Sequence, residues 1–289
     1  MNQDVTKRRA SFQELHRSGC FILPNPWDAG SARRLEKFGF LALASTSSGA
    51  AWAMGREDGD LTRDEVLAHL RALSAATHLP VNGDFEAGFA DAPDQVAANA
   101  VLAAATGIAG LSIEDRTGAA LYDLPLATDR IAATAEALRQ AAPDLLLVAR
   151  TEGFLIGQTD LAITIERLTA YARAGAHCLY APGIADLGAI RELVAAVAPQ
   201  PVNVLLRSGL RVADLAEAAC GASVSAARWP PPPGPASMKR RGRFLTKERS
   251  RRAAEGRLLH RHIHRGGGDP VRDHDQSARP GLDPSGHRK

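Results

Sequence analysis

The chain has 289 residues, of which 45% are hydrophobic, and its formal net charge is +3. It contains no run of about 18 apolar residues, and no apolar signal segment follows the start "MNQDVTKRRA", which argues against a membrane-spanning protein. The cysteines, Cys20, Cys178 and Cys220, are far apart, as is typical of reduced thiols, and we therefore expect a cytoplasmic protein.

Up to residue 226, short apolar runs alternate with longer stretches of helical spacing. The runs, which we predict to be strands, are at 20–23, 40–44, 80–83, 108–113, 145–149, 176–180, 201–206 and 221–225. The helical stretches are at 28–38, 62–77, 93–105, 128–141, 159–173, 186–197 and 211–218. Helix-start signals support them. Thr62 and Glu65 have capping-box spacing, Pro93 suits a first turn, and "TDRIAA" and "TDLAIT" supply Thr or Asp caps.

This alternation predicts an α/β fold whose strands pair in parallel through helical crossovers. Eight strands about 27 residues apart fit a (β/α)8 TIM barrel, which would occupy residues 1–226. An open doubly wound sheet is the alternative, but no glycine-rich fingerprint follows the first strand. We therefore predict a catalytic barrel over residues 1–226.

Polar residues gather where the predicted strands end. In such barrels the carboxyl ends of the strands, with the loops that follow them, build the active site. The candidate site residues are Thr46, Ser47 and Ser48 after the second strand, Asp58 in the same loop, Asp84 and Glu86 after the third strand, Glu114 after the fourth and Arg150 after the fifth. Several acids and one arginine are therefore expected to converge on one mouth of the barrel.

The four candidate acids cannot all ionise close together without a cation. Because neither His nor Cys accompanies them, this oxygen-only set favours Mg²⁺ or Mn²⁺ over zinc. Arg150 can hold a substrate carboxylate bidentately, and the backbone N–H groups of residues 46–48 can bind an anion. A metal ion with two anion-binding groups suits the stabilisation of an enolate derived from a 2-oxo acid.

Each of these residues also has a structural interpretation. Asp84 could cap the helix that follows it. Glu114 and Asp115 could be loop charges, and Arg150 could be the structural partner of one of them. The placement of all of them at successive strand ends favours the functional interpretation.

The segments "STSSGAAWAMGREDG", "VNGDFEAGFAD", "GLSIEDRTG", "VARTEGFL" and "GAHCLYAPG" resemble the isocitrate lyase/phosphoenolpyruvate mutase superfamily, and more narrowly its phosphonomutase-like branch. The resemblance implies a Mg²⁺-dependent barrel that acts on small carboxylates through an enolpyruvate-like intermediate. It implies that Asp84 is the main metal ligand, with Glu86 and Glu114 bound mostly through water. It further implies that Arg150 holds the substrate, that the backbone at Thr46, Ser47 and Ser48 takes the substrate carboxylate, and that Asp58, Glu114 and Arg150 are catalytic.

Two departures from the family pattern narrow the function. Family lyases that cleave isocitrate or methylisocitrate carry a Lys-Lys-Cys-Gly-His loop after strand four, whereas this chain has "EDRTGAALYDLP". The mutase's Asn-containing gating loop is not evident, and Ala181 and Pro182 stand where the mutase has a His. We therefore predict a Mg²⁺-dependent lyase or decarboxylase that cleaves a C–C bond of a small 2-oxo or 2-hydroxy carboxylate. A phosphoenolpyruvate- or phosphonopyruvate-type mutase or hydrolase and an inactive barrel are the alternatives.

Residues 227–289 have a different composition. They contain 16 Lys and Arg against 6 Asp and Glu, whereas residues 1–226 contain 19 against 26. Four consecutive prolines and clusters of Arg, His and Gly predict a disordered basic tail. "HRHIHRGGG" could chelate a metal and the basic run could touch nucleic acid, but we expect no specific nucleic-acid partner.

This tail stands where the barrel should have its eighth helix. The family supplies that helix as an Ala-rich segment, which it exchanges with a partner subunit. A shifted reading frame over "RWPPPPGPASMKRRGR" can encode such a segment, LAAAAWAGFDEAARA, which favours a frameshift near residues 221–228. We therefore expect a family-type homo-oligomer whose assembly is impaired by the altered carboxyl terminus.

Overall fold

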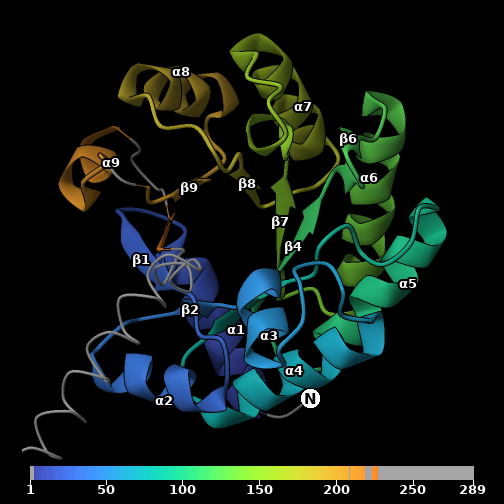
Figure 1. The fold of residues 1–289 in the computed structure, drawn as a ribbon, viewed down its shortest axis with the longest axis vertical. Helices are drawn as coiled ribbons and strands as arrows, with labels where there is room; N and C mark the ends of the chain where they lie inside the picture. Colours follow the sequence, from blue (N-terminus) through green and yellow to red (C-terminus); the bar gives the residue numbers. More distant parts are fainter. Residues whose placement is uncertain (1–2, 208, 219–222, 227–289) are drawn as a thin grey trace, which may run out of the picture. The chain divides into compact units, whose positions relative to one another are not determined.

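The computed structural model of the protein describes residues 3–207, 209–218 and 223–226 (Figure 1). By its internal contacts the chain divides into the units Met1–Trp229 and Pro230–Lys289, and every described element lies in the first. The predicted tail at 227–289 and the position of the eighth helix lie outside the described residues. The disorder of the tail, the missing helix and the frameshift therefore stay predictions.

Eight parallel strands form one curled sheet (Figure 1). They are β1 Phe21–Pro24, β2 Leu43–Ala44, β3 Val81–Asp84, β4 Gly110–Glu114, β7 Leu146–Arg150, β8 Cys178–Tyr180, β9 Val202–Leu205 and β10 Ser223–Ala226. Their order in the sheet is β1-β10-β9-β8-β7-β4-β3-β2, and neighbours in this order pair in parallel. Each strand overlaps one of the predicted apolar runs, so the predicted parallel α/β fold is confirmed.

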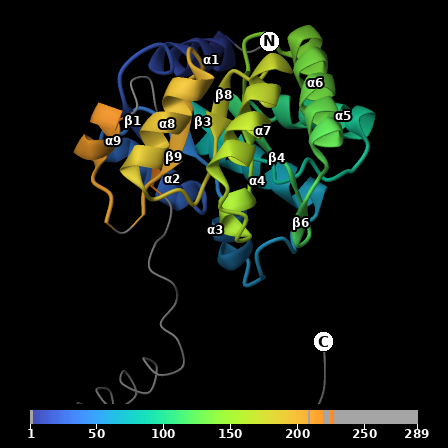
Figure 2. The same cartoon turned by 90° about the horizontal axis from the view of Figure 1, so that it is seen from above.

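Nine α-helices lie within the described ranges, and several of them surround the sheet (Figures 1 and 2). They are α1 Gln3–Leu15, α2 Ala29–Lys37, α3 Ser47–Ala53, α4 Arg63–Ala76, α5 Pro93–Ala104, α6 Leu124–Ala141, α7 Leu161–Arg173, α8 Leu187–Val197 and α9 Val212–Ala218. The sequence did not predict α1, α3, the 3₁₀ turn Gly153–Leu155 or the hairpin of β5 Arg116–Thr117 with β6 Ala120–Leu121. None of the described helices combines the length and apolar character that a bilayer crossing requires.

Most of the predicted helix starts are confirmed. Thr62 and Glu65 form a capping box at α4, Pro93 begins α5, and the Asp160 side chain caps α7. The start predicted at "TDRIAA" is wrong, because α6 begins four residues earlier, at Leu124. Thr128 therefore lies inside the helix, where its hydroxyl donates a hydrogen bond to the backbone one turn back, at 2.7 Å.

Alternate residues of each strand face opposite sides of the sheet. The inner side holds a buried cluster of Phe12, Phe21, Leu23, Ala42, Ala44, Ala109, Leu146, Val148, Cys178 and Tyr180. The outer side packs on the helices through a larger cluster that includes Leu43, Leu111, Ile113, Leu147, Ala149 and Leu179. Because both faces are apolar, the strands read in the sequence as short continuous apolar runs.

Helix α1 lies across the amino ends of the strands, on the side of the sheet away from α3 (Figure 2). Its Arg9 is buried, donates a hydrogen bond to the Ile108 carbonyl at 3.0 Å and pairs with Asp144 at 2.8 Å. The Phe12 ring is fully buried, and a Cβ at Gly110 would lie 2.6 Å from it, so the glycine leaves room for the ring. The amino end of the sheet is therefore filled, which leaves the carboxyl end for a site.

A side chain links the two terminal strands of the sheet, β1 and β2. Asn25, which follows β1, donates hydrogen bonds from Nδ2 to the carbonyls of Ala44 at 2.8 Å and Ser45 at 3.3 Å. Both acceptors lie at the end of β2. The contact joins the ends of the curled sheet at its carboxyl edge.

Candidate active site

A cavity of about 800 Å³ opens at the carboxyl ends of the strands. Six of the eight residues that the sequence predicts for the site line it, namely Thr46, Ser47, Ser48, Asp58, Asp84 and Arg150. The other two lie beside it: the Glu86 N–H is 3.4 Å from an Asp84 oxygen, and Glu114 Oε2 is 3.6 Å from Arg150 Nε. The structure therefore brings the predicted residues together at one end of the sheet.

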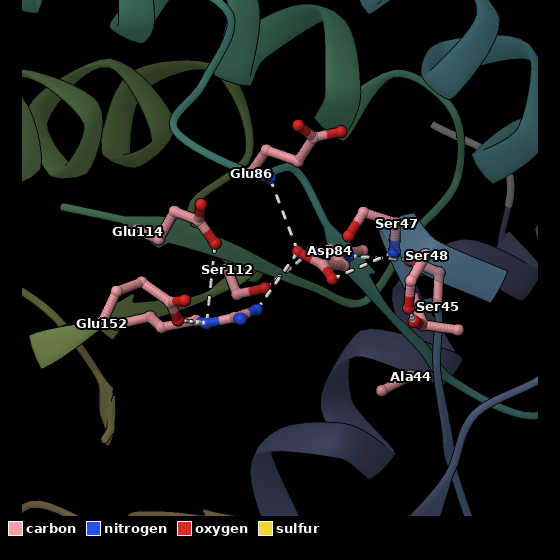
Figure 3. A network of polar contacts seen from close by, with 12 residues as sticks. Ala44, Ser45, Ser47, Ser48, Asp84, Glu86, Ser112, Glu114 and Glu152 are labelled. Atoms are coloured by element: carbon pink, nitrogen blue, oxygen red, sulfur yellow. Dashed lines mark hydrogen bonds and ion pairs between the residues drawn. The ribbon is translucent and has the colours of Figure 1, made fainter. Parts of the chain in front are cut away.

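Asp84, the last residue of β3, is held by neighbours on both sides (Figure 3). Its Oδ2 accepts a hydrogen bond from the Ser47 N–H at 3.2 Å, and its Oδ1 accepts one from the Glu86 N–H at 3.4 Å. Its own N–H donates to Ser45 Oγ at 2.7 Å. The following helix begins only at Pro93, so the interpretation of Asp84 as a helix cap is wrong.

Glu86 occupies a strained turn directly after Asp84. Its φ is +48° and that of Phe89 is +58°, in the left-handed region that non-glycine residues seldom adopt. Its carbonyl accepts the Glu114 N–H at 2.9 Å, which ties the turn to β4, yet its Oε1 is buried without a hydrogen-bond partner. Burial, followed by the charges of Asp84 and Asp58, raises the pKa of Glu86 to about 7. Strain at an unpartnered carboxylate is typical of a functional site.

Arg150, the last residue of β7, is surrounded by carboxylates. Its guanidinium lies 3.6 Å from Asp84 Oδ1 and 3.6 Å from Glu114 Oε2, and it forms a closer pair with Glu152 Oε1. The Tyr180 ring centroid is 5.3 Å from its Cζ. Burial alone would lower the pKa of Arg150, but the carboxylates outweigh it and hold that pKa well above its usual value, so the group stays charged.

One guanidinium does not balance the acids around it. Burial raises the pKa of Glu114 to about 8, because it exceeds the opposing effect of Arg150 and is reinforced by Glu152, Asp84 and Glu86. Glu86 and Glu114 therefore resist ionisation near neutral pH. Such perturbed groups beside a cavity mark a candidate catalytic centre.

Glu152 and Asp115 are site residues that were not among the candidates predicted from the sequence, which offered Asp115 only as a loop charge. Glu152 is 2% exposed, and its N–H donates to Asp115 Oδ1 at 3.0 Å. Asp115 Oδ2 accepts hydrogen bonds from Arg167 at 3.0 Å and from the Tyr171 hydroxyl at 2.6 Å. This buried network positions Glu152 against the guanidinium of Arg150. The only signal in the sequence was that each acid lies close to a predicted site residue.

The segment 46–48 forms the start of α3 and not an open turn. Thr46 is the N-cap, and its hydroxyl lies 3.0 Å from Ser48 Oγ. The Ser47 N–H, which the sequence assigned to a substrate carboxylate, instead donates to Asp84. The described contacts therefore connect this segment to Asp84, the predicted metal ligand.

Gly49 sets how closely Trp27 approaches this segment. A Cβ at Gly49 would overlap the Trp27 ring and lie 2.6 Å from Thr46 Cγ2. Although alanine favours a helix over glycine by about 0.5–1 kcal/mol, we expect Gly49→Ala to destabilise the protein by about 1–3 kcal/mol through this overlap. Urea unfolding followed by tryptophan fluorescence measures the change. Gly30→Ala, where the nearest atom would be 3.3 Å away, is the control, and equal effects of the two variants would contradict the expectation.

The donors in this site fit a hard divalent cation. All are carboxylate oxygens, and one of them, Glu86 Oε1, is buried without a partner. In the described part of the chain no three His, Cys, Asp or Glu residues lie close enough to ligate one ion together. Mg²⁺ usually takes one or two carboxylates and retains several waters, so this arrangement is compatible with it. The family resemblance predicts that Asp84 binds the ion directly and that Glu86 and Glu114 bind it through water.

Comparisons with known proteins agree with this picture. The family model described as phosphoenolpyruvate phosphomutase matches residues 12–230. A solved structure from Burkholderia cenocepacia J2315, assigned as a lyase/mutase, has 42% identity and a TM-score of 0.74, covering 87% of this chain and 90% of that one. The 2-methylisocitrate lyase of Escherichia coli K12 is 32% identical, over 59% of this chain and 60% of that enzyme. Oxaloacetate decarboxylase 2 of Pseudomonas fluorescens Pf0-1 is 29% identical, over 65% of this chain and 66% of that enzyme. The chain spans less than two thirds of the length of either enzyme.

Proposed function

The chain belongs to the phosphoenolpyruvate phosphomutase family, within the isocitrate lyase/phosphoenolpyruvate mutase superfamily, and on this premise we propose that it is a Mg²⁺-dependent enzyme that cleaves a carbon–carbon bond of a small 2-oxo or 2-hydroxy carboxylate. The observation that carries the proposal is the surplus of carboxylates around Arg150. Asp84, Glu114 and Glu152 all lie against one guanidinium, and the pKa of Glu114 is raised to about 8. A purely structural ion pair needs no such surplus, whereas a divalent cation with an anionic substrate uses it.

The residues of the site have distinct roles in this proposal. Arg150 would bind the substrate carboxylate. This contact would replace part of the contact that Arg150 makes with Glu114 and Glu152. When bound, Mg²⁺ would stabilise negative charge on the 2-oxo oxygen and would therefore favour an enolate. For a 2-hydroxy substrate, Asp58 is the candidate base for the hydroxyl proton. The carbon that carried the hydroxyl would then become the carbonyl of one product. The electron pair of the breaking C–C bond would pass to the other product, which leaves as its enolate. Glu114, whose pKa burial raises to about 8 in the metal-free protein, is the candidate acid that would return a proton to the enolate carbon.

The hairpin after β4 argues against isocitrate-type cleavage. Its strands, Arg116–Thr117 and Ala120–Leu121, belong to a segment that contains no Cys, His or Lys to act as a general acid. A decarboxylation needs no acid at that place, because carbon dioxide leaves without a proton. The likeness to an oxaloacetate decarboxylase supports this form of the proposal.

Titration of oxalate, a planar mimic of enolpyruvate, tests the proposal by calorimetry with and without Mg²⁺. We expect binding that requires Mg²⁺ and that weakens at least about tenfold in Asp84→Asn, the loss of roughly one charged contact. Asp64→Asn is the matched control, because Asp64 is 78% exposed and lies outside the cavity. A protein that melts cooperatively but binds no oxalate would be an inactive barrel. Phosphate release from phosphonopyruvate would instead favour the mutase or hydrolase alternative.

We also propose that the curled sheet is a closed (β/α)8 barrel. Residues that follow or belong to β1, β2, β3, β4, β7, β8 and β9 line the same cavity, which supports closure, and Asn25 bridges β1 to β2. The eighth helix and the homo-oligomer that it would build remain predictions, and molar mass by light scattering tests the latter.

A further inference from the structure

A buried arginine on a neighbouring helix holds the turn that carries Glu86. Arg130 lies on α6 and is 1% exposed. Its Nη1 donates hydrogen bonds to the carbonyls of Ala90 at 2.5 Å and Asp91 at 2.7 Å, and its Nη2 donates to the carbonyl of Ala87. One guanidinium therefore binds three carbonyls of the same turn.

An arginine is an expensive residue for a position closed to solvent. The hydrogen-bond acceptors of Arg130 in the described part of the chain are these carbonyls and not carboxylates, and the Tyr122 ring centroid lies 4.1 Å from its Cζ. Burial costs a cation its hydration, and an apolar side chain would fill the space without that cost. The rigid fork of five N–H donors gives a reason for arginine, because it can satisfy several carbonyls at once.

A second side chain holds the same turn from α5. Asn99 is 7% exposed, and its Nδ2 donates a hydrogen bond to the Gly88 carbonyl at 2.9 Å. Its Oδ1 accepts a hydrogen bond from Arg63 at 3.0 Å, which orients the amide. A Cβ at Gly88 would lie 2.7 Å from Val96 Cγ1, so the turn also packs closely on α5. Side chains from two helices therefore fix the turn.

These contacts hold a strained backbone next to the predicted metal ligand. Glu86 and Phe89 have positive φ, which costs about 1–3 kcal/mol for each residue, so the turn keeps this shape only because its surroundings impose it. The Glu86 N–H donates to Asp84 Oδ1 at 3.4 Å (Figure 3), and Glu86 Oε1 is buried without a described partner. A simple chain reversal needs no such strain, whereas a carboxylate that must stay in one place near Asp84 does.

We propose that Arg130 is a positioning residue, which holds the turn 85–91 and thereby places Glu86 for the metal ion. The inference rests on the proposed function of the cavity at Asp84. Arg130 is not among the described residues that line this cavity, so its replacement should act through Glu86. Residues that orient metal ligands in this way typically contribute about 10–100-fold to metal affinity.

A double-mutant cycle tests the proposal. Mg²⁺ is titrated by calorimetry, in the presence of oxalate, into the wild-type protein, Arg130→Lys, Glu86→Gln and the double variant. Lysine keeps the charge but lacks the fork that binds three carbonyls. We expect Arg130→Lys to weaken Mg²⁺ binding at least about tenfold in the wild-type background and less than about twofold in the Glu86→Gln background.

Arg9→Lys is the matched control. Arg9 is also a buried arginine, 3% exposed, and it donates to the carbonyls of Ile108 at 3.0 Å and Ala104 at 2.8 Å, but it lies at the amino end of the sheet. Its replacement should lower the free energy of unfolding and leave Mg²⁺ binding unchanged. If Arg130→Lys does not fold, Asn99→Ala, which removes the hydrogen bond to the Gly88 carbonyl, takes its place in the cycle.

Hydrogen exchange in EDTA examines the turn without the metal. The Gly88 N–H donates to the Phe85 carbonyl at 2.9 Å. We expect this amide to exchange at least about tenfold faster in Arg130→Lys than in the wild-type protein, and at an unchanged rate in Arg9→Lys.

The outcomes separate this inference from the proposed function. If the wild-type protein binds neither oxalate nor Mg²⁺, the proposed site is wrong and the inference fails with it. If the wild-type protein binds both, three results would show that Arg130 does not position Glu86, while the proposed function stands. These are an unchanged Mg²⁺ affinity in Arg130→Lys, an equal loss in the two backgrounds, and an unchanged exchange rate at Gly88.

Discussion

Replacement of Arg150 by methionine is expected to destabilise the protein by about 3–5 kcal/mol and to weaken Mg²⁺-dependent oxalate binding roughly a hundredfold. The guanidinium is 17% exposed and lies against Asp84, Glu114 and Glu152, so its removal leaves buried negative charge without a partner. Urea unfolding at pH 8 in EDTA measures the stability, and calorimetry measures oxalate binding. Binding at wild-type affinity would show that Arg150 does not hold the ligand.

Two further variants separate charge from geometry. Arg150→Lys keeps the positive charge but cannot form two parallel hydrogen bonds with a carboxylate, so we expect it to retain most of the stability and to lose most of the oxalate affinity. Arg139→Met removes an arginine whose side chain is 69% exposed and paired with Glu136 three residues away. We expect this control to change stability by less than about 0.5 kcal/mol, as is usual for surface pairs.

The Arg150 variant also distinguishes a structural ion pair from a metal site. If the surrounding acids bind a cation, Mg²⁺ should restore part of the stability that Arg150→Met loses, because the ion supplies the missing positive charge. Mg²⁺ should then stabilise the variant more than the wild-type protein. If the acids are only structural partners of Arg150, Mg²⁺ will leave the variant as unstable as in EDTA.

The fold was largely predictable because its signals are local. The strands from β1 to β9 in the eight-stranded sheet are buried on both faces and therefore read as apolar runs. Thr62, Pro93 and Asp160 mark helix starts that the structure contains. Helix α1 was missed because it buries few residues, chiefly Arg9 and Phe12, and so shows almost no amphipathic pattern. Helix α3 was missed because its small residues, between Ser47 and Ala53, resemble a turn.

The location of the site was predictable, but its pairings were not. Carboxyl ends of parallel strands meet at one edge of a sheet, which is why Asp84, Glu114 and Arg150 could be placed together from the sequence. The role of Glu152 depends on Asp115, whose side-chain partners are 37 and more residues away along the chain. Contacts of this kind follow from tertiary packing, and no local pattern encodes them.

The metal-free protein is expected to lose stability as the pH rises from 6.5 to 8.5. The folded-state pKa values of Glu86 and Glu114 are raised to about 7 and about 8, against 4.5 for the unfolded chain. Stability from such groups is fully present below pH 4.5 and is lost as the pH rises through the raised values. Allowing for coupling between the two acids, we expect a loss on the order of 2 kcal/mol across this interval.

The choice of interval keeps histidines out of the measurement. Burial lowers the pKa of His16, His69 and His177 below 6.5, so these groups destabilise the fold only at lower pH and act in the opposite direction. Urea unfolding in EDTA at several pH values gives the slope, and Glu114→Gln should remove most of it. Saturating Mg²⁺ should also flatten the slope, because a bound cation favours the ionised carboxylates. A metal-free stability that is constant or increases over this interval would mean that the carboxylates are ionised without help, and the case for a cation at Asp84 would fail.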